Sequence, residues 1–165
     1  MAAGTYAALK VLDPSAARIY EYIKKNKLPQ GYEDRQALHC TVIWSKRECP
    51  DMFPEFDVVH RARPGDLHVF HSEGKKRLVL MLDAPTVVER HKTLMREHNA
   101  VYAWDEFHPH VTIAYDIGDF DWWKLPPINF DIILGDENVR AGNDLKLKEK
   151  RPKWKRIQKI LSEIA

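Results

Sequence analysis

Cysteine is scarce in this chain of 165 residues, which contains only Cys40 and Cys49. The two fall in no paired spacing of the kind that binds zinc, and nothing at the N-terminus resembles a charged and then apolar signal segment. We therefore expect a protein of a reducing cytoplasm. Long apolar runs are missing too: none approaches the roughly 18 residues that a membrane-spanning helix needs, so we expect no membrane association.

An excess of charge of one sign is also absent, because 26 Lys and Arg stand against 24 Asp and Glu. This balance argues against a surface that coats long nucleic acids. The exception is residues 146–165, where eight basic side chains accompany only two acidic ones. Apolar residues from Trp154 to Ile164 follow helical spacing there, which predicts a basic amphipathic helix. Such a helix either packs on the body or forms a contact for a partner or a homo-oligomer.

What the chain does contain is a pair of short β-branched and aromatic runs with one shared pattern. The first holds His39 and Thr41, the second His110 and Thr112, and both runs predict buried strands. Side chains on a strand alternate between its faces, so in each run the histidine and the threonine share a face. Each strand therefore presents an imidazole beside a hydroxyl.

Some His-x-Ser/Thr matches are expected by chance: with eight His and nine Ser or Thr, the composition alone predicts roughly half a match in this chain. Three matches occur. The third, His91 with Thr93, lies in a helical pattern, where residues two apart point away from each other. We therefore expect His91, like His98, to be an ordinary residue of a helix face.

The segments that precede the other two matches indicate a duplication, because the same order of elements leads to each histidine. A strand-like run, an aspartate and a helical pattern precede it, and the spacing is 26 residues from Asp13 to His39 and 27 from Asp83 to His110. The predicted fold is α+β: a bilobal, duplicated strand-helix-strand fold with two antiparallel sheets around a central cleft. The apolar content of 44% suits one domain over residues 1–145.

The lobes are expected at roughly residues 1–60 with the C-terminal strand, and at 61–135. Within the second lobe, Arg63–Asp66 has the composition of a turn between two strands. A later strand over Ile128–Leu134 is expected to end at a turn formed by Gly135–Glu137.

Two imidazoles facing each other across a cleft suit a phosphate ester. Displacement at phosphorus needs one proton removed from the nucleophile and another given to the leaving oxygen, and histidine does both near neutral pH. Thr41 and Thr112 would donate hydrogen bonds to a non-bridging phosphoryl oxygen. This arrangement requires no metal and no cofactor.

The paired His-Cys-Thr and His-Val-Thr motifs resemble those of the two-histidine phosphoesterase superfamily, over roughly residues 5 to 137. Within it, the Gly4–Tyr6 start, the compact size and the Leu134–Glu137 segment are similar to the phage anti-CBASS nucleases, which cleave the cyclic oligonucleotide signals of bacterial antiviral defence. The resemblance implies a cyclic di- or trinucleotide substrate, such as cyclic GMP-AMP. It also implies action in a host cytoplasm if a phage encodes the chain.

The resemblance further implies a role for seven residues. The acid and base would be His39 and His110, the phosphate would be held by Thr41 and Thr112, bases would stack on Tyr6 and on or beside Phe70, and a base would contact Glu137. The ribose 2′-hydroxyl would attack its own 3′-phosphate and give a 2′,3′-cyclic phosphate that water can open. The basic tail from Lys146 has no counterpart in this resemblance.

Three alternatives stay open. A housekeeping RNA 2′,3′-cyclic phosphodiesterase would use the same four His and Thr residues. A non-catalytic nucleotide-binding module would need only the phosphate contacts. A metal site is the third, because His108 and His110 share a strand face and His39 would complete a three-histidine set.

Overall fold

The computed structural model describes residues 4–29, 37–141 and 146–148, and its elements confirm the α+β class. The helices are α1 (Ser15–Lys25), α2 (Pro85–His98) and a short 3-10 turn, η1 (Trp122–Lys124). The strands are β1 (Thr5–Val11), β2 (His39–Ser45), β3 (His60–Ser72), β4 (Lys75–Asp83), β5 (His110–Ala114), β6 (Ile132–Ala141) and β7 (Lys146–Lys148).

All the strand pairs are antiparallel, and they follow the order β1-β2-β5-β4-β3-β6-β7, with β6 also paired to β1. Six strands therefore close into one continuous sheet, and the prediction of two separate sheets is wrong. Two short joins connect the halves: Cys40 of β2 pairs with Val111 of β5, and the start of β3 pairs with the start of β6. Through these two pairings, backbone hydrogen bonding continues from one half of the sheet to the other.

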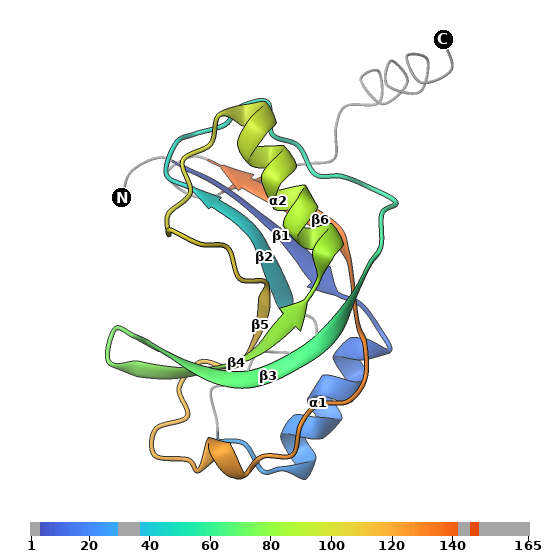
Figure 1. Ribbon diagram of the computed structural model, residues 1–165, viewed down its shortest axis with the longest axis vertical. Helices are drawn as coiled ribbons and strands as arrows, with labels where there is room; N and C mark the ends of the chain where they lie inside the picture. Colours follow the sequence, from blue (N-terminus) through green and yellow to red (C-terminus); the bar gives the residue numbers. More distant parts are fainter. Residues whose placement is uncertain (1–3, 30–36, 142–145, 149–165) are drawn as a thin grey trace.

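The helices lie at opposite ends of this sheet (Figure 1). In that view α2 lies across β1, β2 and β6, whereas α1 lies at the lower end. Helix α1 buries Ile19 and Ile23, and α2 buries Val87, His91 and Leu94, at the spacing that places them on one face of a helix. The long β3–β4 hairpin and the loop between α2 and β5 both project on one side of the molecule (Figure 1).

Two predicted turns prove to be β-bulges inside longer strands. Strand β3 runs through Arg63–Asp66, where one extra residue opposes β4 between Pro64 and Leu67. Glycine fits there because a side chain on Gly65 would come within 2.8 Å of the carbonyl oxygen of Met81. The composition of this segment is therefore explained by a close approach of two backbones.

Strand β6 likewise continues through Gly135–Glu137 to Ala141, so the predicted end of that strand at Gly135 is wrong. Between the paired residues Gly135 and Asn138, β6 has two residues where β1 has one, and Asp136 takes a positive φ of 47°. The bulge inserts one residue without ending the strand. It also changes which later side chains point to which face.

The predicted C-terminal helix is wrong at its first residues, because Lys146–Lys148 forms β7 and pairs with Val139–Ala141. The rest of that prediction, residues 149–165, lies outside the described residues. In the described part of the chain, no helix is both long and apolar enough to cross a bilayer.

Candidate active site

Strands β2 and β5 form the floor of the candidate site, and their alternation places the two motifs on one face. Cys40 and Val111 pair directly and are fully buried on the core side. Their neighbours on each strand, His39, Thr41, His110 and Thr112, are partly exposed on the other side. Continuing the antiparallel register by one residue sets His39 beside Thr112 and Thr41 beside His110. The two motifs are thus interleaved.

Matching hydrogen bonds orient the two imidazoles. The Nδ1–H of His39 donates to the carbonyl oxygen of Ala37 at 2.9 Å, and that of His110 donates to the carbonyl oxygen of His108 at 2.8 Å. Because a carbonyl oxygen only accepts, Nδ1 carries the proton in both rings, and the lone pair of each neutral ring lies on Nε2. Each ring therefore has a fixed tautomer with Nε2 as its basic atom.

Burial and neighbouring imidazoles change the pKa of His110. Burial lowers the pKa of His110 below its usual value, the hydrogen bond to His108 raises it, and repulsion from the imidazoles of His39 and His108 lowers it further. The net direction is downward, so His110 stays neutral, and hence basic, to a lower pH than an ordinary histidine. The neighbouring thiol of Cys40 is no rival nucleophile, because burial raises its pKa to about 12.

These side chains open into a cavity of about 1100 Å³. Its walls come from β1, β2, β3, β4, β5, β6 and the loop between α2 and β5, and comprise Tyr6, His39, Thr41, Trp44, Val69, Phe70, His71, Ser72, Arg77, Tyr102, Trp104, Asp105, Glu106, Phe107, His108, His110, Thr112, Tyr115 and Arg140. The structure thus brings together six of the seven residues singled out from the sequence.

Each histidine has an aromatic ring against it. Tyr6 meets His39 edge-on with ring centroids 6.5 Å apart, and its hydroxyl shares a hydrogen bond of 2.9 Å with the hydroxyl of Thr41. Phe70 meets His110 in the same way at 5.1 Å. In each half, an aromatic ring therefore lies edge-on against the imidazole of the His-x-Thr motif.

A family model described as "Anti-CBASS protein Acb1" matches residues 3–150. The chain belongs to the Acb1 family of anti-CBASS proteins. Among curated members, the protein of Acinetobacter phage Ac42 is 32% identical over 70% of this chain and 75% of its own length. That of Salmonella phage S16 is 29% identical over 70% and 74%, and that of Enterobacteria phage T4 is 26% identical over 88% and 87%.

A solved structure is similar to this Acb1-family chain in fold. The crystal structure of TT0787 of Thermus thermophilus aligns with a TM-score of 0.58 over 84% of this chain and 86% of its own. The two sequences are 17% identical, so this likeness concerns the fold alone.

Glu137 is the one predicted site residue that does not line the cavity of this Acb1-family chain. Its carboxylate accepts hydrogen bonds from the Arg90 guanidinium at 2.7 and 3.0 Å and from the Glu55 backbone N–H at 3.0 Å. The Glu137 side chain is 1% exposed. The structure therefore places it in a buried ion pair between α2 and β6.

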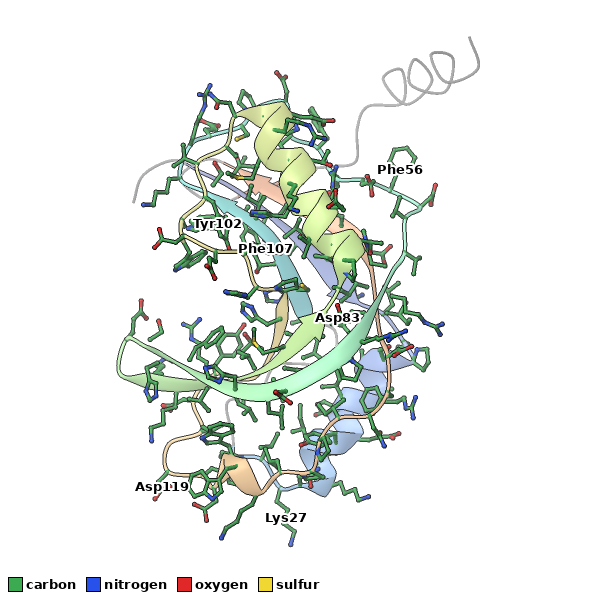
Figure 2. All side chains as sticks on the ribbon, viewed as in Figure 1. Lys27, Phe56, Asp83, Tyr102, Phe107 and Asp119 are labelled. Atoms are coloured by element: carbon green, nitrogen blue, oxygen red, sulfur yellow. The ribbon has the colours of Figure 1, made fainter. Side chains whose placement is uncertain are left out.

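Sequence reasoning missed the wall formed by the loop between α2 and β5. Figure 2 labels Tyr102 and Phe107 on this loop, and Trp104, also on it, is 59% exposed. The cluster of aromatic and acidic residues over 102–107 was the available signal, but a loop has no periodicity that would assign its faces. Trp44, Arg77 and Arg140 of the Acb1-family cavity were also missed.

Two further predictions concerned histidines: His91 as an ordinary residue of a helix face, and a three-histidine metal site. His91 is buried, stacks on Phe107 at 4.1 Å and is hydrogen-bonded through Nδ1 to the carbonyl oxygen of Val42 at 2.7 Å, which confirms it as a packed residue of α2. Among the residues that the structure describes, no three His, Cys, Asp or Glu side chains are grouped to hold a metal ion. His108 instead donates from Nε2 to the carboxylate of Glu106 at 3.0 Å.

Proposed function

We propose that this chain is a phosphodiesterase that cleaves the 3′-5′ bonds of cyclic di- or trinucleotide defence signals, using two histidines and no metal, in the manner of the two-histidine phosphoesterases. The observation that carries the proposal is the convergence of two His-x-Thr pairs on adjacent strands above one cavity. Membership of the anti-CBASS Acb1 family supports the target, since these proteins are named for countering CBASS defence.

The lowered pKa of His110 supports the assignment of the acid and base roles in this proposal. His110, whose pKa is lowered, is the general base, and its Nε2 takes the proton of the ribose 2′-hydroxyl. The 2′-oxygen attacks the adjacent phosphorus, and the bond from phosphorus to the 5′-oxygen breaks. His39, in its imidazolium form, gives a proton to that leaving oxygen. The products are a 2′,3′-cyclic phosphate and a free 5′-hydroxyl.

The threonines and the aromatic rings position the substrate in this scheme. Thr41 and Thr112 donate to non-bridging phosphoryl oxygens, where charge develops during the displacement. Tyr6 and Phe70 offer rings on which bases stack, a contact that contributes roughly 1–3 kcal/mol per base. The cavity of about 1100 Å³ is ample for a compact cyclic nucleotide.

A nucleotide cleavage panel tests the proposal. Cyclic GMP-AMP, a cyclic trinucleotide and an RNA with a 2′,3′-cyclic phosphate end are each incubated with the protein and separated by chromatography, with and without excess chelator. We expect cleavage of the cyclic nucleotides in both conditions, since side chains supply the acid, the base and the phosphate contacts. Processing of RNA ends alone would favour the housekeeping alternative, and activity that only added divalent metal restores would overturn the metal-free mechanism.

A further inference from the structure

Arg77 is a cation in the cavity wall that the proposed chemistry does not use. It lies on β4 directly opposite Phe70 of β3, and its guanidinium carbon is 5.4 Å from the centroid of the Tyr115 ring. Its Nε is buried and has no hydrogen-bond partner. Among the described residues, no carboxylate lies within ion-pair distance of this guanidinium. A buried N–H donor without an acceptor is rare in folded proteins and calls for an explanation.

The strand register places Arg77 two residues along β4 from the position opposite Thr112, the residue proposed to hold the reacting phosphate. Val79 pairs with Thr112 of β5, and Arg77 is two residues before Val79 on the same face of β4. Two residues of strand span about 7 Å, so Arg77 is displaced from Thr112 along β4 by roughly that length. A nucleoside between two phosphates spans a comparable length.

We propose that Arg77 binds a second phosphate of the substrate, one nucleoside away from the phosphate that is cleaved. This inference rests on the proposed function and specifies it further: the preferred ligand carries at least two phosphodiesters. A guanidinium suits this role because its Nε and one terminal nitrogen form a fork that matches two phosphate oxygens. In this proposal the second phosphate supplies the acceptor that the Arg77 Nε lacks.

Binding of uncleavable ligands tests the inference separately from catalysis. The probes are a 2′-deoxy cyclic dinucleotide with two phosphodiesters and the linear deoxydinucleotide d(ApA) with one, each titrated calorimetrically. We expect Arg77→Met to lower the affinity for the cyclic ligand about 10- to 100-fold, because the variant loses a charge-assisted contact. The affinity for d(ApA) should change less than about twofold. Arg77→Lys should retain part of the affinity, because it keeps the charge but lacks the fork.

Arg140→Met is the matched control, because Arg140 lines the same cavity and carries the same charge but is exposed. We expect Arg140→Met to lower the affinity for both ligands by a similar factor, and by less than Arg77→Met lowers the affinity for the cyclic ligand. Equal losses for both ligands in Arg77→Met, or a selective loss in Arg140→Met as large as in Arg77→Met, would overturn the second-phosphate site. A selective loss in Arg77→Met alone would support it even if the protein cleaved neither ribonucleotide, an outcome that would count only against the proposed function.

Discussion

Among single side chains, the two histidines and their threonines carry the proposed chemistry. We expect His39→Ala and His110→Ala each to lower kcat by roughly 10² to 10⁴, the range for losing a general acid or base. Thr41→Ala and Thr112→Ala should cost less, since each removes one of several phosphate contacts. Steady-state cleavage of cyclic GMP-AMP measures these effects.

His91→Ala is the control for these substitutions. His91 matches the same sequence pattern but packs against Phe107 and Val42, so its loss should lower the unfolding temperature and leave kcat nearly unchanged below that temperature. A fall in kcat as large as that of His39→Ala, in a protein still folded by circular dichroism, would show that the catalytic pair has been assigned wrongly.

The titration of His110 is a second prediction about a single side chain. Because burial and His39 lower its pKa, NMR titration should give a midpoint below pH 6.5. Since protonated His39 repels protonated His110, His39→Ala should raise that midpoint toward 6.5. A midpoint at or above 6.5 in the unmodified protein would contradict the assignment of His110 as the base.

Among the secondary-structure elements, α2 is fixed to β6 by the buried pair of Arg90 and Glu137. Their side chains are 12% and 1% exposed, and the hydrogen bond and charge of Glu137 raise the pKa of Arg90 against the effect of burial. Glu137→Ala leaves the buried Arg90 with the longer ion pair to the Glu55 carboxylate at 3.6 Å, so it should lower the free energy of unfolding by about 3 kcal/mol, the lower end of the range for a broken buried ion pair. Chemical denaturation checks this value.

The same variant tests the role that the sequence predicted for Glu137. If Glu137 only anchors α2, KM for cyclic GMP-AMP at a temperature where the variant is folded should change little. A large increase in KM with unchanged stability would instead restore Glu137 as a contact to a base.

The elements also explain which parts of the site were predictable from the sequence. The strands of His39 and His110 were predictable, because strict alternation over a few residues is a local property of the sequence. The face of Glu137 was not, because the bulge at Asp136 shifts the alternation and Arg90, its partner, is 47 residues away. Likewise Gly65 has the composition of a turn, and only the close approach of Met81 on the paired strand shows why glycine stands inside β3.

Across the whole molecule, buried histidines make stability depend on pH. Burial lowers the pKa of His60, His91 and His110, so the folded protein binds fewer protons than the unfolded chain as the pH falls through about 6.5. The contribution of these neutral histidines to stability is therefore fully present above that pH and is lost as the pH falls through their lowered pKa values. Scanning calorimetry should show a lower unfolding temperature at pH 5.5 than at 7.5, with a smaller difference in His91→Gln. An unchanged or higher unfolding temperature at pH 5.5 would contradict this account.

The closure of six strands around the candidate site bears on the substrate. The cavity brings two histidines together, and the Cys40 thiol is buried on the opposite face, away from it. In the proposed mechanism the nucleophile is the ribose 2′-hydroxyl, which has a large advantage in effective concentration when it is held in line.

The most direct test of the two-histidine mechanism compares cleavage of cyclic GMP-AMP with that of its 2′-deoxy and 2′-methoxy analogues, following the products by chromatography. We expect the ribonucleotide to give a 2′,3′-cyclic phosphate intermediate and the analogues to bind but remain uncut. Cleavage of the analogues at the rate of the ribonucleotide would contradict attack by the 2′-hydroxyl.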